Sequence, residues 1–314
     1  MNIYIKILTA ITVISLLGIE IVGRYYRINV YPTYEHSSKY EYVLDSNQKI
    51  KFYSGNVFST NSHGMRSEEV SNKKKKILLI GDSVLYGGSN SDNSEIASSI
   101  LQNLLDNKDE NIQVLNISAN SWGPDNAAAY IEEHGTFDSK MVVLVFSSHD
   151  AFDNMTHEPI VGVDYRYPDN LSYFALQDFF SRAFRKVKRT IFKKQINQHQ
   201  INSSNQTFNS GFEAIFKVCR RNKIPVIVYH HLEQDEIVND KINNKGRIIE
   251  KFCTDHQVPF YTELNMQPKI DYLSDHIHFN PEGQKYLASN LFRIIDNHLN
   301  IFEKERQPTT RHSQ

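Results

Sequence analysis

Short runs of aliphatic residues alternate with longer stretches of helical periodicity over most of this chain. The apolar runs, four to six residues each, cover 77–80, 113–117, 141–146, 226–229 and 258–261, and predict strands buried on both faces. Periodic segments predict helices at 95–107, 126–134, 212–221, 246–256 and 281–299. Because right-handed crossovers place helices on both faces of a parallel sheet, this order predicts a three-layer α/β/α sandwich around a five-stranded parallel sheet.

A different pattern opens the chain, where residues 3–22 are almost all apolar apart from Lys6 and Glu20. This length matches a bilayer core, with the two charged side chains at its edges, and no small-x-small cleavage site follows. We therefore expect residues 1–24 to form an uncleaved, single-pass transmembrane helix. The alternative is a buried amphipathic helix.

Three further segments surround the predicted core, which spans residues 76–300. Residues 25–75 are polar and tyrosine-rich, and we interpret their His63 and Arg66 as satisfied surface residues. Residues 151–209 form an insertion that contains a basic amphipathic helix at 176–191. That helix either lies on an anionic membrane or contacts an acidic polysaccharide, or packs on the domain with its basic face solvated. The polar tail, 301–314, is expected to be disordered.

Composition excludes several classes of function. The formal charge of −1 argues against nucleic-acid binding, and the chain has no Gly-rich phosphate loop, Cys-x-x-Cys pair or His-Glu-x-x-His motif. We therefore expect no cofactor and no metal ion. The two cysteines, Cys219 and Cys253, occupy equivalent places on successive predicted helices, and we expect free, buried thiols.

A serine at the end of the first buried strand is the main candidate for chemistry. The strand ends in Gly81-Asp82-Ser83, and ligands bind outside the carboxyl ends of strands in an open α/β sheet. Near the other end of the chain, Asp275 and His278 lie three residues apart in a loop before a helix that begins at Asn280-Pro281. A serine needs a base to become a nucleophile, and a carboxylate orients the imidazole that serves as that base.

These two blocks resemble those of the SGNH/GDSL hydrolase family, over roughly Lys76 to Leu299. The resemblance implies a flavodoxin-like SGNH hydrolase fold with Ser83 as nucleophile, His278 as base and Asp275 as the residue that orients it. His276, in the same loop, is the alternative base.

The family's two middle blocks supply hydrogen-bond donors to the oxyanion. Gly123, in the loop 118–124, matches the glycine of the second block, so the resemblance implies an oxyanion hole of the Ser83 and Gly123 N–H groups. The third block departs from the family, because His149 stands in Ser147-Ser148-His149-Asp150 where an asparagine is usual. His149 replaces that donor, or Asn154 does, or activity is weakened or lost.

The resemblance implies a serine esterase whose substrate is an O-acyl group, such as O-acetyl, on a carbohydrate or cell-envelope polysaccharide, or a small ester. An O-acetyltransferase with the same triad, which would need an assembly partner, and a silent polysaccharide-binding protein are the alternatives. Membrane-anchored bacterial members of the family imply a periplasmic or extracellular catalytic domain.

Overall fold

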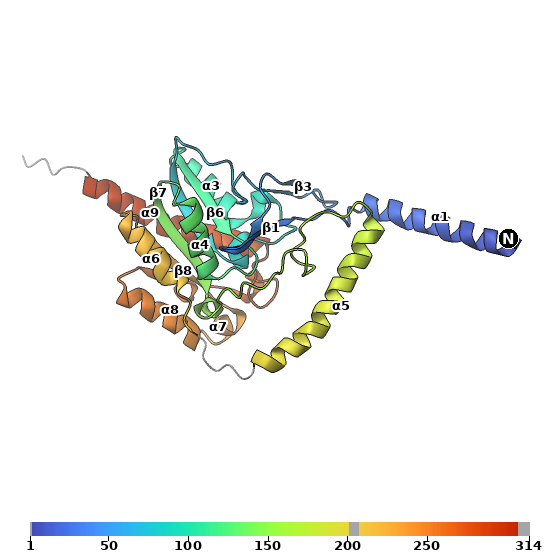
Figure 1. Ribbon diagram of the computed structural model, residues 1–314. Helices are drawn as coiled ribbons and strands as arrows, with labels where there is room; N and C mark the ends of the chain where they lie inside the picture. Colours follow the sequence, from blue (N-terminus) through green and yellow to red (C-terminus); the bar gives the residue numbers. More distant parts are fainter. Residues whose placement is uncertain (1, 201–206, 307–314) are drawn as a thin grey trace, which may run out of the picture.

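The computed structural model describes residues 2–200 and 207–306 (Figure 1). Five parallel strands form the central sheet in the order β6-β5-β7-β8-β9. They are β5 (Lys75–Gly81), β6 (Ile112–Ser118), β7 (Ser139–Ser147), β8 (Val226–His231) and β9 (Phe260–Thr262). The predicted fold class is confirmed, although the last strand begins two residues later than expected.

Helices cover both faces of this sheet, because successive side chains of a strand point to opposite sides. Ile77 and Leu79 pack in one buried cluster with residues of α3 (Ala97–Asp106) and α9 (Pro281–Arg306). Leu78 and Ile80 pack in the other, with residues of α4 (Pro124–His134), α6 (Gly211–Arg221) and α8 (Asn244–Asp255). Cys219 and Cys253 are buried free thiols in this second layer, as predicted.

The structure differs from the sequence analysis in one less regular segment and adds detail in another. Helix α9 continues to Arg306, so residues 301–306 are helical, whereas 307–314 lie outside the described residues. The segment 25–75 contains two antiparallel hairpins that the sequence pattern did not predict. Their strands are β1 (Tyr34–Ser37), β2 (Glu41–Leu44), β3 (Lys49–Lys51) and β4 (Val57–Ser59). Strands of three or four residues are too short to show a clear period.

The hairpins support the loop that leads to Gly123. The Tyr42 hydroxyl shares its proton between the carbonyls of Asn120 and Ser121, at 2.8 and 3.1 Å. The Trp122 indole donates in return to the Tyr42 carbonyl at 2.8 Å. The N-terminal extension therefore holds one edge of the candidate site.

Two long helices extend from the sandwich. Helix α1 (Ile3–Tyr25) is long and apolar enough to cross a membrane, a property that it shares with signal sequences. Helix α5 (Ala175–Gln200) belongs to the insertion and contacts α1 near the C-terminal end of α1 (Figure 1).

Candidate active site

The structure brings Ser83, His278 and Asp275 together at the carboxyl edge of the sheet. Ser83 Oγ lies 2.9 Å from His278 Nε2, and His278 Nδ1 lies 2.7 Å from Asp275 Oδ2. A carboxylate only accepts hydrogen bonds, so Nδ1–H donates to Asp275 and Nε2 is left to accept the Ser83 hydroxyl proton. This is the geometry that activates a serine nucleophile.

The turn after β5 positions Ser83. A side chain at Gly81 would place its Cβ 2.6 Å from the Val145 carbonyl oxygen, so only glycine allows β5 to approach β7 this closely. Asp82 accepts the Val84 N–H at 2.9 Å and caps α2 (Ser83–Tyr86), the short helix that Ser83 begins. The N–H of a first helical residue has no acceptor within the helix, so the Ser83 N–H is available to a ligand.

The loop that carries the other two residues is held by local hydrogen bonds. Asp275 Oδ1 accepts the backbone N–H groups of Ile277 at 2.9 Å and His278 at 2.8 Å. Burial opposes ionisation of Asp275, but these bonds and the His278 imidazole lower the pKa of its carboxyl to about 2. Asp275 is therefore ionised at neutral pH. Asn280 accepts the N–H groups of Glu282 and Gly283 as the predicted cap of α9.

His231, at the end of β8, contacts the backbone of this loop. The sequence pattern did not identify this residue. It is fully buried, with Nδ1 2.9 Å from Glu263 Oε2 and Nε2 2.7 Å from the Ile277 carbonyl oxygen. Both partners are acceptors, so both ring nitrogens carry protons. Although burial opposes this, the contacts with Glu263 and Ile277 raise the pKa of His231. His231 is thus a positioning residue for the loop of Asp275 and His278.

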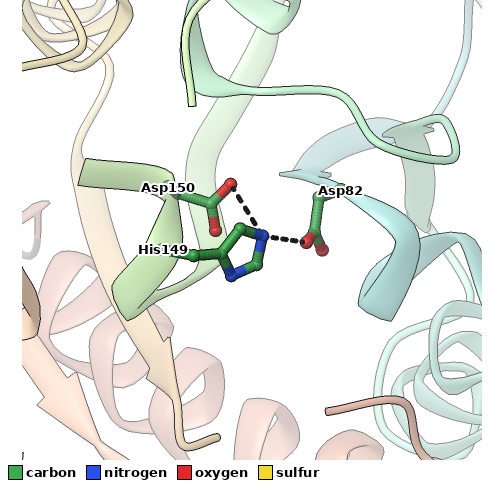
Figure 2. A group of neighbouring side chains, drawn as sticks. All are labelled: Asp82, His149 and Asp150. Atoms are coloured by element: carbon green, nitrogen blue, oxygen red, sulfur yellow. Dashed lines mark ion pairs between the residues drawn. The ribbon is translucent and has the colours of Figure 1, made fainter. Parts of the chain in front are cut away.

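His149 lies among three carboxylates. Its Nε2 is 3.6 Å from Asp82 Oδ2 and 3.8 Å from Asp150 Oδ1 (Figure 2). Its Nδ1 is 3.4 Å from Glu233 Oε1. The charge of Asp150 is the main cause that raises the pKa of His149, to about 10. Burial opposes this shift, whereas Glu233 and Asp82 add to it. The raised pKa favours the imidazolium form of His149, on the strand end next to that of Ser83, while burial also raises the pKa of Asp150 well above its usual range.

The same cluster is the one place in the described residues where side chains could share a metal ion. Asp82, His149 and Asp150 each offer one ligand atom, and these atoms lie within 4.8 Å of one another. A cation would have to displace the Nε2 proton of His149, because a ligating imidazole is neutral. We assign a proton rather than a cation to His149 Nε2, since the protonated ring offsets the negative charge of the neighbouring acidic groups.

The remaining sequence candidates have other partners. The Gly123 N–H donates to Asn126 Oδ1 at 2.8 Å, and a Cβ at Gly123 would lie 2.1 Å from the Asp153 carbonyl oxygen, which explains the glycine on structural grounds. Asn154 donates to the carbonyls of Phe152 and Thr207. His276 is exposed, with Nδ1 3.9 Å from Asp275 Oδ1. The geometry of the loop favours His278 over His276 as the base.

Arg66 was expected at the surface, and this prediction is wrong. Its side chain is 2% exposed and donates to the carbonyls of Tyr86, Gly88 and Ser91. It therefore fastens the segment that follows the helix of Ser83. An isolated arginine in a polar segment carries no sequence signal of burial, because its partners are backbone carbonyls distant in the chain.

No family model and no curated protein matches the chain in sequence. Among solved structures, it resembles a lipase/acylhydrolase from Enterococcus faecalis, with 13% identity over 71% of this chain and 96% of that one and a TM-score of 0.43. A member of the lipolytic G-D-S-L family from Veillonella parvula has 12% identity over 70% and 97%, with a TM-score of 0.40. A two-domain esterase active on acetylated mannans has 11% identity over 75% and 55%, with a TM-score of 0.43.

The Veillonella parvula structure is described as a member of the G-D-S-L family, which the sequence motifs of this chain resemble. Similarities of this size carry no conclusion about activity, which rests on the site itself.

Proposed function

We propose that this protein is a serine esterase of the SGNH type. The observation that carries the proposal is the pair of hydrogen bonds that links Ser83 to His278 and His278 to Asp275, at 2.9 and 2.7 Å. Ser83 Oγ attacks the acyl carbon while its proton passes to His278 Nε2. The tetrahedral intermediate then expels the alcohol, which takes that proton. Water, deprotonated by His278, attacks the acyl-enzyme and releases the acid and free Ser83.

The N–H of Ser83 is the first donor that we propose for the oxyanion. The Gly123 N–H joins it when its hydrogen bond to Asn126 lengthens or is shared. His149 contributes its fixed positive charge from the neighbouring strand end in place of the usual asparagine. This assignment keeps the three residues expected from the sequence but gives His149 an electrostatic role, because both of its ring nitrogens face carboxylates.

An acylated carbohydrate, with O-acetyl as the first choice, is the substrate that we propose. The side chains of His278 and Asp275 are 39% and 46% exposed, so the reacting groups lie at an open surface. Such a site admits an ester on a bulky, polar alcohol, whereas enclosed apolar clefts suit small hydrophobic ligands.

Hydrolysis of p-nitrophenyl acetate by the full-length chain in detergent tests the mechanism. We expect Ser83→Ala and His278→Ala to lower kcat by about 10⁶-fold. His276→Ala is the matched control, because this histidine lies in the same loop and has no bond to Ser83. Full activity in Ser83→Ala, with no labelling of Ser83 by a fluorophosphonate in the wild type, would refute the proposal.

The role of His149 has a separate test. His149→Ala should lower kcat about 10²-fold, the usual effect of losing one oxyanion-stabilising group, whereas His149→Asn should recover part of that loss by restoring an amide donor. Equal rates in wild type and His149→Ala would remove His149 from the mechanism.

The substrate class is tested by release of acetate from an acetylated polysaccharide, compared with esters of long-chain acids. Addition of a sugar acceptor distinguishes hydrolysis from transfer, because a transferase would form the acetylated sugar and less free acetate. Binding of the polysaccharide without turnover would identify a silent binding protein.

We also propose that α1 remains attached as a single-pass anchor and holds the catalytic domain on the periplasmic or extracellular side. The helix has 23 residues and a mean hydropathy of 2.1 over its most apolar window, which supports a membrane span. Protease accessibility of residues 25–306 in intact cells and in spheroplasts checks both the attachment and the side.

A further inference from the structure

Helix α5 turns a polar face to the domain and an apolar face outward, which is the reverse of a surface helix in a soluble domain. Two of its polar residues face the domain: Asp178, 1% exposed, accepts the Tyr31 hydroxyl at 2.5 Å, and the Arg182 guanidinium lies over the Tyr31 ring at 4.7 Å. A surface helix of a soluble domain normally buries its apolar stripe and exposes its polar face.

The apolar stripe of α5 points away from the domain. Phe180, Phe184 and Val187 repeat at helical spacing and are 63%, 71% and 57% exposed. Figure 1 shows α5 running beside the sandwich rather than across a face of the sheet. Among the described residues, nothing covers these large apolar side chains, and exposed apolar patches of this kind mark interaction sites.

The end of α1 fixes where α5 begins. The Glu20 carboxylate accepts the N–H groups of Ala175 at 3.0 Å and Leu176 at 2.9 Å, which caps the N-terminus of α5. Arg24 donates to the Tyr173 carbonyl at 2.6 Å. Glu20, expected from the sequence to reach water at the membrane edge, is instead the link between the two helices.

This link lies at the level of a membrane interface if α1 spans the bilayer. At about 1.5 Å per residue, α1 is roughly 35 Å long, slightly more than a hydrocarbon core of about 30 Å. Tyr25, Tyr26 and Tyr53 form an exposed aromatic cluster at the end of α1, with ring centroids 4.8 to 5.5 Å apart. Exposed Tyr173 and Phe174 lie at the start of α5. Aromatic residues of this kind concentrate at membrane interfaces.

We propose that α5 lies in the surface of the same membrane that α1 enters, with Phe180, Phe184 and Val187 in the headgroup and acyl boundary. The sequence 175–200 has seven Lys and Arg residues and one acidic residue, which favours an anionic lipid surface. The two helices then hold the catalytic domain in a set orientation against the membrane. This inference rests on the proposed anchor but not on the esterase activity.

Site-specific labelling of the full-length chain in vesicles of phosphatidylcholine and phosphatidylglycerol tests the inference. The environment-sensitive fluorophore NBD is attached to Phe180→Cys, and separately to Val187→Cys in case one variant folds poorly. Native Cys219 and Cys253 are buried and do not compete for the label. Ser181→Cys is the matched control on the same helix, about 100° away. Lys251→Cys, on the exposed side of α8, is the control on the domain.

We expect doxyl-labelled lipids to quench NBD at positions 180 and 187 severalfold more than at 181 and 251, with a blue shift of emission at the first two. Equal quenching at all four positions would overturn the proposal. So would disulfide formation between chains through Phe180→Cys with no lipid quenching, because a second copy would then cover the stripe. Flotation of the chain with the vesicles reports separately on insertion of α1.

Discussion

Replacing Arg66 by lysine tests how the N-terminal extension supports the nucleophile. The guanidinium makes five hydrogen bonds of 2.8 to 3.0 Å, three to the carbonyls of Tyr86, Gly88 and Ser91 and two to Asn93 Oδ1. It also stacks over the Phe58 ring at 4.5 Å. Because the side chain is 2% exposed, burial lowers the pKa of Arg66 to about 10.

Lysine keeps the positive charge but offers three donors from a single point, so Arg66→Lys loses at least two of the five hydrogen bonds. A hydrogen bond to a charged group contributes about 1.5–3 kcal/mol, and loss of the stacking adds to this, so we expect the free energy of unfolding to fall by about 4 kcal/mol. For a domain of this size the melting temperature should drop by about 10 °C.

Differential scanning calorimetry of the full-length chain in detergent measures this drop, with Arg220→Lys on the exposed side of α6 as the matched control. Esterase kinetics on the same samples should show a reduced kcat, because the segment 86–91 follows directly on the helix that Ser83 begins. A melting temperature within about 1 °C of the wild type would refute the reasoning, since the loss of hydrogen bonds from a buried guanidinium should lower the free energy of unfolding.

Three further outcomes follow from the site. Asp275→Asn should lower kcat about 10⁴-fold in steady-state assays, because the amide does not hold His278 in the required tautomer, and an unchanged kcat would exclude the triad. The raised pKa of His149 stabilises the fold fully below about pH 6.5, and this contribution is lost as the pH rises to about 10. Because the His149 side chain is 36% exposed, solvent screening reduces this contribution to the free energy of unfolding to about 2 kcal/mol. In thermal unfolding, His149→Asn should therefore destabilise the protein at pH 6 and have little effect above pH 10. Gly246→Ala should destabilise by about 1–3 kcal/mol in denaturant titrations, since its Cβ would lie 2.4 Å from Ser148 Oγ beside the candidate site, whereas Gly18→Ala, with open space around it, should not.

The alternation of apolar runs and periodic segments determined the sheet, its parallel strands and the two helical layers. A buried parallel strand must be apolar throughout, so the signal lies in the residues themselves, as at 77–80 and 141–146. The ends of strands in such a sheet meet at one edge, which is why Ser83 and His278 could be paired from the sequence before their distance was known.

Other features depend on contacts between residues that are distant in the chain, and only the tertiary structure decided them. The sequence drew attention to His149 in the block after the third strand, but its pKa depends on Asp82 and Glu233, from two other segments, as well as on its neighbour Asp150. The burial of Arg66 and the part played by His231 depend on backbone carbonyls, which no side-chain pattern encodes. For α5, periodicity established that the helix is amphipathic, but which face meets the domain depends on Tyr31 and Glu20, far from it in sequence. Local pattern thus specifies elements and their faces, whereas the pairing of polar groups, which determines charge and orientation, exists only once the chain has folded.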